Sequence, residues 1–366
     1  MRAVGGPGGG PGPRLRSREA QHRPARRCYP RHAAQPALAL FASALAVLLV
    51  VVWYLRPLPG AEAAGAHQVP AAAASQYGTV SEPPREIQVP ATAEHPAYTI
   101  YTPGGLPSGS PSTITLLALH GMGGNGPGIA APVLPFARAR GWTVIAPTIN
   151  YGDWRDPNQL ISEELGLQPQ LARLLDAVPA ETGITLGERV LLFGFSRGAQ
   201  ASLRFALLYP ERVEAVAAVA AGTYTLPAKT IKTAAGTTLN APLPYGVADL
   251  EQRMGRGLDQ LEISGVRFWI GVGSKDNRDG DVPRQWDQFV GRNRVERAER
   301  FANALGQAGF QVQLTIVPDA GHELSAPMVS AASAFLNGVA QEMQAQLAAA
   351  TTSEPVPAPT RRTTRA

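Results

Sequence analysis

Short apolar runs that alternate with longer helical patterns constrain the fold of this chain more than any other feature of its sequence. Near-continuous apolar runs of β type occupy residues 112–120, 142–149, 189–195, 213–221, 266–273 and 310–318. Helical patterns lie at about 128–140, 157–178, 197–209, 294–309 and 325–349. Strands that are apolar along their whole length are buried on both faces, and intervening helices favour parallel pairing. The sequence therefore predicts an α/β domain with a mostly parallel central sheet and helices on both faces.

Two stretches depart from this alternation. Short runs at 86–89 and 98–101 predict an antiparallel pair at the start of the sheet. Residues 222–265 do not continue the alternation of strand and helix patterns, and they are too few for a separate domain. We expect them to form a small lid or an excursion over the edge of the sheet.

An uncharged apolar stretch at residues 37–55 predicts a transmembrane helix. At ~1.5 Å per residue it spans roughly 28 Å, close to the ~30 Å hydrocarbon core of a bilayer. Eight arginines crowd the first 36 residues and account for the positive formal charge of +5. Because those arginines precede the span, the N-terminus is expected in the cytoplasm and the domain outside. The remainder is nearly neutral, so no nucleic-acid partner is predicted.

The alternative to a permanent signal anchor is a cleaved signal peptide, with secretion of the domain. Ala61, Glu62 and Ala63 would suit a small-x-small cleavage site. The apolar stretch exceeds the roughly 7 to 15 residues of a signal-peptide core, which favours the anchor. Cys28, the only cysteine, precedes the span, so the exported part is predicted to contain neither a disulfide nor a thiolate metal site.

Composition divides the rest of the chain into a domain and its flanks. Residues 1–36 form a Gly/Pro/Arg-rich tail that we expect to be disordered, and residues 56–84 form an Ala/Pro-rich linker. The α/β domain is predicted at 85–349, followed by a second disordered tail at 350–366.

The pentapeptide GFSRG, residues 194–198, has the G-x-S-x-G pattern and lies between an apolar run and a helical pattern. This spacing suits a sharp strand-to-helix turn, because only small neighbours clear the strained backbone of the central serine. A serine hydroxyl needs a general base to act as a nucleophile, and the base needs an orienting acid. Asp276 follows the run at 266–273, and His322 follows the run at 310–318.

The order serine, aspartate, histidine, each after a strand, resembles the α/β-hydrolase fold over about residues 112–345. The resemblance implies Ser196 as the nucleophile, Asp276 as the orienting acid and His322 as the general base. Asp279 and Asp281 are the other candidates for the acid. The sequence around the serine and the compact layout, with a small cap or none, resemble esterases of the polyhydroxyalkanoate-depolymerase-like or feruloyl-esterase-like branch.

Residues 121–126 read GMGGNG and match the nucleotide-binding pattern G-x-G-x-x-G letter for letter. A dinucleotide site also needs an acidic residue at the end of the next strand, and none occurs there before Asp153. We therefore expect no nucleotide. By resemblance, this loop begins at His120 and supplies an oxyanion donor. The implied donors are the backbone amides of Met122 and Arg197, with Gly123 as the alternative to Met122.

Three further patterns bear on the site. The acidic run 276–281 does not fit a calcium loop, because Lys275 would occupy its first position, and no metal or cofactor is predicted. A cation in the first turn of a helix opposes the helix dipole. We therefore expect Arg197 to pair with Glu163, Glu164 or Glu323, or else to face an anionic part of the substrate. The aromatic residues Tyr151, Trp154 and Trp286 either wall a substrate pocket or simply pack.

These patterns predict a membrane-anchored serine hydrolase that cleaves small or polymeric carboxylic esters through an acyl-enzyme. Two other classes remain open. One is a serine peptidase of the prolyl-oligopeptidase type, although the chain has no room for the propeller domain or insertion of such enzymes. The other is a non-catalytic surface protein that uses the same fold for binding.

Overall fold

The computed structural model describes residues 84–104, 114–232 and 236–352. The predicted membrane span at 37–55 and the cleavage site at 61–63 lie outside these residues, as do the tail at 1–36, almost all of the linker and residues 353–366 of the predicted C-terminal tail. Residues 350–352, which were assigned to that tail, are helical. Within the described ranges, no helix is long and apolar enough to cross a membrane.

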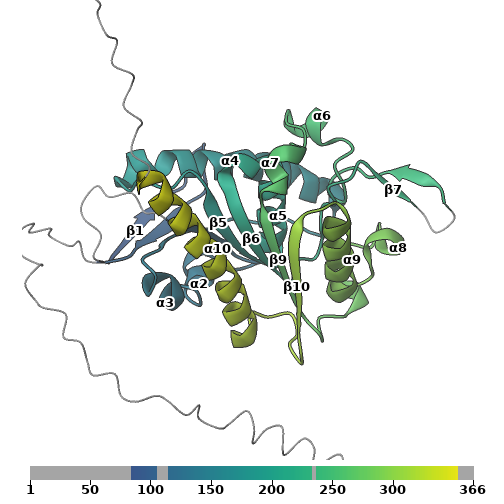
Figure 1. Cartoon of the computed structure of the whole chain (residues 1–366). Coiled ribbons are helices and arrows are strands. Elements are labelled where there is room, and N and C mark those ends of the chain that lie inside the picture. The colour runs from purple at the N-terminus through teal and green to yellow at the C-terminus, as the bar shows by residue number, and fades with distance from the viewer. Residues whose placement is uncertain (1–83, 105–113, 233–235, 353–366) are drawn as a thin grey trace, which may run out of the picture. The chain divides into compact units, whose positions relative to one another are not determined.

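A central eight-stranded sheet has the strand order β1-β2-β4-β3-β5-β6-β9-β10 (Figure 1). The first two strands pair antiparallel, β2 pairs antiparallel with β4, and every other pair in the sheet is parallel. The mostly parallel sheet and its opening antiparallel pair are therefore confirmed. The strands are β1 Arg85–Val89, β2 Tyr98–Thr102, β3 Thr115–Leu119, β4 Thr143–Pro147, β5 Val190–Phe195, β6 Val213–Val219, β9 Arg267–Gly273 and β10 Gln311–Val317.

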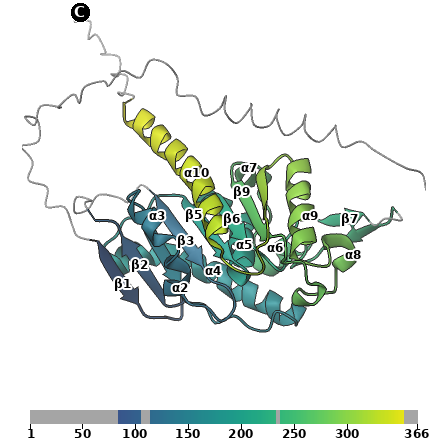
Figure 2. The ribbon, with the colours of Figure 1, turned by 90° about the horizontal axis from the view of Figure 1, so that it is seen from below.

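Helices cover both faces of the sheet, as Figure 2 shows from below. One apolar core joins the sheet to α4 (Pro157–Thr182), α5 (Arg197–Leu208) and α9 (Arg294–Gln307). A second core on the other face joins it to α2 (Gly126–Ala130), α3 (Leu134–Arg138) and α10 (Ala326–Thr352). The inner strands β3, β4 and β5 are buried along almost their whole length, which accounts for their continuous apolar sequences.

The helix predicted at 128–140 is instead two short helices, α2 and α3. Pro132 and Pro135 interrupt it, because proline lacks the backbone N–H that a continuous helix needs. Pro135 instead occupies the first turn of α3, where its missing N–H costs nothing.

The stretch 222–265 is an excursion at the side of the domain. It contains a hairpin of β7 (Thr230–Lys232) and β8 (Thr238–Asn240), followed by the short helices α6 (Leu250–Met254) and α7 (Gln260–Ser264). The hairpin projects outward beside α8 (Asp287–Val290) in both views. Leu243, Val247 and Leu250 pack against Leu208 at the end of α5 and tie the excursion to the domain.

Two glycines allow a matched test of how closely α2 packs on β4. A Cβ atom on Gly126 would lie 2.1 Å from the carbonyl oxygen of Ala146 in β4, whereas a Cβ atom on Gly166, inside α4, meets nothing within 4 Å. We predict that Gly126→Ala lowers the free energy of unfolding by about 1 to 3 kcal/mol through overpacking. Gly166→Ala should raise it by about 0.5 to 1 kcal/mol through higher helix propensity. Urea unfolding of both variants checks this, and equal effects would contradict it.

Candidate active site

The turn between β5 and α5 holds Ser196 in a strained backbone conformation, with φ 54° and ψ −112°. Close backbone approaches require both glycines of the pentapeptide. A Cβ atom on Gly198 would lie 2.0 Å from the carbonyl oxygen of Leu119, and one on Gly194 would lie 2.5 Å from the carbonyl oxygen of Gly198. The Ser196 amide donates to the carbonyl of Val219 at 2.8 Å, which ties the turn to β6. The G-x-S-x-G spacing is thus a packing requirement of this turn.

Ser196, His322 and Asp276 form one hydrogen-bonded chain. His322 Nε2 lies 3.0 Å from Ser196 Oγ, and His322 Nδ1 lies 2.8 Å from Asp276 Oδ2. Because the carboxylate accepts from Nδ1–H, Nε2 is free to accept from the serine hydroxyl. The ring of Phe195 stacks on the imidazole at 5.1 Å between centroids and limits its movement. The three side chains follow parallel strands and therefore meet at one edge of the sheet.

The geometry separates the three candidate acids. Asp276 is buried and contacts His322, whereas Asp279 pairs with Arg292 at 2.6 Å and Asp281 with Arg278 at 3.6 Å. Neither Asp279 nor Asp281 has a contact with His322 in the described part of the chain. Only Asp276 is therefore placed to orient the imidazole.

The loop after β3 lies against the serine. A Cβ atom on Gly121 would be 3.2 Å from the Cβ of Ser196, and Gly123 has a left-handed φ of 71°. Among the described residues, the amides of Met122 and Arg197 donate to no other group. The Arg197 amide directly follows the serine, and the Met122 amide belongs to the loop against it. Both stay predicted oxyanion donors, with Gly123 as the alternative to Met122.

His120 fixes this loop, a function that the sequence did not indicate. Its Nδ1 lies 2.7 Å from the carbonyl oxygen of Gly121, and its Nε2 accepts from the amide of Ile149 at 2.9 Å. This pairing requires a neutral ring with its proton on Nδ1. Burial lowers the pKa of His120 below the ordinary 6.5, and the hydrogen bond to Gly121 offsets only part of that effect.

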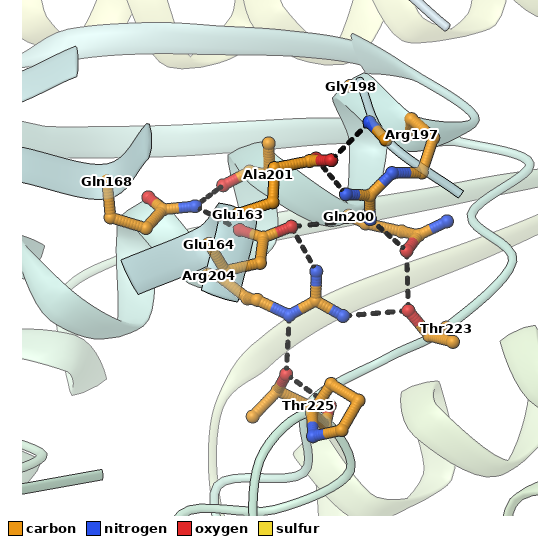
Figure 3. Close-up of polar contacts among 12 residues, drawn as sticks. Glu163, Glu164, Gln168, Arg197, Gly198, Gln200, Ala201, Arg204, Thr223 and Thr225 are labelled. Carbon is orange, nitrogen blue, oxygen red and sulfur yellow. Dashed lines mark hydrogen bonds and ion pairs between the residues drawn. The ribbon is translucent and has the colours of Figure 1, made fainter. Parts of the chain in front are cut away.

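A buried charge network surrounds the side chain of Arg197, the residue that follows Ser196 (Figure 3). The side chain of Arg197 pairs with Glu163 and, at 3.3 Å, with Glu164, which confirms two of the expected partners. Glu323 is not among its partners in the described residues. Glu164 also pairs with Arg204 at 2.6 Å.

The network is balanced, with two carboxylates against two guanidinium groups. Burial alone would raise the pKa of Glu164, but the attraction of Arg204 and Arg197 outweighs burial, and the pKa lies below its ordinary range. Glu163 also accepts from the amide of Gly152 at 2.5 Å, so the network reaches the loop after β4.

The three predicted pocket aromatics differ in position. The ring of Tyr151 packs edge-on against His120 at 5.3 Å between centroids, and its centroid lies 5.2 Å from the guanidinium of Arg197. Trp154 contacts Arg155, and Trp286 stacks on Tyr245 at 5.4 Å. Their role in binding substrate stays a prediction. The described residues contain no group of three or more potential metal ligands.

One residue at the site, Arg294, was missed by the sequence analysis. Its Nη1 donates to Asp276 Oδ1 at 3.0 Å. Arg294 and Arg297 both lie in the first turn of α9, where a cation opposes the helix dipole. The signal that predicted partners for Arg197 was therefore also present here.

Comparison with known proteins supports the fold. No family model and no curated protein sequence matches the chain. A poly(3-hydroxybutyrate) depolymerase from Bordetella parapertussis is similar in structure, with a TM-score of 0.51, 23% identity and coverage of 70% of this chain and 91% of the other.

Two more distant structures are also similar. They are poly(aspartic acid) hydrolase-1 from Sphingomonas sp. KT-1 (TM-score 0.49, 21% identity, coverage 69% and 97%) and a ferulic acid esterase from Anaeromyces mucronatus (TM-score 0.44, 16% identity, coverage 69% and 89%). Together with the sheet order and the serine turn, the likeness to the depolymerase shows that this chain has the α/β-hydrolase fold.

The neutral state of His120 predicts a specific pH dependence of stability. Because its pKa is lowered on folding, the unfolded chain binds more protons below pH 6.5, and the folded state loses stability there. We predict that the stability difference between the natural protein and His120→Gln is largest near pH 8 and shrinks as the pH falls below 6.5. Urea unfolding at several pH values measures this difference, and other titrating groups cancel in it. A difference independent of pH would contradict the assignment.

Proposed function

We propose that this protein is a serine hydrolase that cleaves carboxylic esters through an acyl-enzyme. One observation carries the proposal, namely the hydrogen-bonded chain from Ser196 through His322 to Asp276 at the strand ends of an α/β-hydrolase fold. The nucleophile, base and acid stand in the order and contacts that acyl transfer needs.

The first half of the reaction makes the acyl-enzyme. Ser196 Oγ attacks the ester carbonyl carbon while its proton passes to His322 Nε2, and Asp276 stabilises the resulting imidazolium. The carbonyl oxygen becomes an oxyanion that accepts from the amides of Met122 and Arg197, and one such donor is worth roughly 3 to 4 kcal/mol. The oxyanion then re-forms the carbonyl, the C–O bond to the alcohol breaks, and His322 returns its proton to the departing oxygen.

The second half releases the acid. Water enters the position of the departed alcohol and gives a proton to His322 while its oxygen attacks the acyl carbon. A second oxyanion forms at the same amides. It collapses, and the Ser196 oxygen leaves with the proton from His322, which restores the free enzyme. No cofactor takes part in either half.

Esters are the proposed substrates because the surroundings of the serine and the layout of the domain resemble esterases. The similar depolymerase carries a polyester substrate in its name, which is compatible with a polymeric ester here. The experiments below distinguish an esterase from the two alternatives, a serine peptidase and a non-catalytic binding protein.

We also propose that residues 37–55 anchor the domain on the outer side of the membrane. Support comes from the uncharged apolar stretch and the arginines before it. The full-length protein should remain with membranes after a carbonate wash, and external protease should digest the domain in intact cells or spheroplasts. A released product that begins near residue 64 would indicate a cleaved signal instead.

Substitution of the nucleophile tests the activity. In full-length protein, a fluorophosphonate probe should label the natural chain, and Ser196→Ala should abolish labelling and reduce kcat for a short p-nitrophenyl ester by roughly 10⁴- to 10⁶-fold. Ser264→Ala, at an exposed position of helix α7, is the matched control and should leave both unchanged.

A second pair of variants tests the acid. Asp276→Asn should lower kcat by roughly 10⁴-fold, whereas Asp279→Asn should keep most of the activity.

Labelling that survives Ser196→Ala would overturn the proposal. Cleavage of peptides in preference to esters would favour a peptidase, and a folded natural protein without labelling would favour a binding protein.

A further inference from the structure

Arg294 is a buried cation in direct contact with the triad acid. Its side chain is 10% exposed, and that of Asp276 is 2% exposed. Nη1 of Arg294 donates to Asp276 Oδ1 at 3.0 Å, and Nη2 donates to the carbonyl oxygen of Asp281 at 2.8 Å. A buried charge at the start of a helix is costly without a counterion, and Asp276 supplies it.

The two carboxylate oxygens of Asp276 have different partners. Oδ2 accepts from His322, and Oδ1 accepts from Arg294. No other side-chain hydrogen bond or ion pair of Asp276 occurs in the described ranges of the chain, and its backbone amide donates to the carbonyl of Gly273. Without Arg294, Oδ1 would be a buried anionic oxygen with no donor, and rotation of the carboxylate about its Cβ–Cγ bond would be unopposed on that side.

We propose that Arg294 is a positioning residue for the reaction, and this proposal rests on the proposed hydrolase function. Its guanidinium fixes the plane of the Asp276 carboxylate through the hydrogen bond to Oδ1. The carboxylate in turn fixes the imidazole of His322, so that Nε2 stays directed at Ser196. In the described residues Arg294 has no hydrogen bond to Ser196 or His322, so it would act through Asp276.

Arg297, three residues further along α9, provides a matched structural control. It is 1% exposed and donates to the carbonyl oxygens of Gly222 at 2.6 Å and Gly291 at 2.9 Å, and it pairs with Asp287 at 3.0 Å. It has no contact with the triad in the described part of the chain. Both arginines tie α9 to its neighbouring loops, but only Arg294 contacts the acid.

A double-mutant cycle in the full-length protein separates positioning from general stabilisation. Arg294→Met should lower kcat for the short ester by roughly 10- to 100-fold with KM changed by less than about twofold, and Arg294→Lys should restore part of kcat. In the Asp276→Asn background, Arg294→Met should change kcat by less than about twofold, because no carboxylate remains to be positioned. Arg297→Met should lower the melting temperature without a comparable loss of kcat.

A spectroscopic measurement tests the same proposal without activity. In the natural protein we expect the Nδ1 proton of His322 in the downfield region of the proton NMR spectrum. This resonance should shift or broaden in Arg294→Met and Arg294→Lys and persist in Arg297→Met. If Arg294→Met does not fold, Arg294→Lys, which keeps the charge, is compared with Arg297→Lys in kcat and in this resonance.

The outcomes are distinguishable. An unchanged kcat in folded Arg294 variants, or an equal loss in the Asp276→Asn background, would overturn the positioning role. Failure of the proposed function would show instead as no hydrolysis and no labelling of Ser196 in the natural protein, whatever Arg294 does to the resonance.

Discussion

The contact between Gly198 and the carbonyl oxygen of Leu119 is the constraint on which the rest of the site depends. It brings the first turn of α5 onto the end of β3 with no room for a side chain between them. The strained turn at Ser196 and the loop that begins at Gly121 are therefore in contact. Any larger residue at position 198 would move the serine away from the loop whose Met122 amide is a proposed oxyanion donor.

Buried arginines in first helical turns connect this turn to the rest of the domain. Arg197 in α5 and Arg294 and Arg297 in α9 each oppose a helix dipole, at a cost of about 0.3 to 1 kcal/mol. Each is compensated by carboxylates or carbonyl groups on another segment of the chain. An unfavourable local placement is thus balanced by contacts that hold the loops of Ser196 and Asp276 in place.

Most of the sheet and the candidate triad were predictable from local patterns. Apolar runs indicated the strands of the central sheet, and the glycine spacing indicated the turn at Ser196. The helix predicted at 128–140 was wrong because Pro132 and Pro135 interrupt it. The pair of hydrogen bonds by which His120 fixes the loop after β3 was not predictable, because one partner, Ile149, lies in another loop 29 residues away.

The sequence by itself determined the class of fold, because strand and helix periodicities are local and the mostly parallel order follows from them. It also placed Ser196, Asp276 and His322 after strands whose ends meet at one edge. Only the tertiary structure decided which aspartate faces the imidazole and that Arg294 holds its other oxygen. These two contacts join residues that lie 46 and 18 positions apart in the sequence. They depend on the directions of the side chains in the folded domain, which no local sequence pattern encodes.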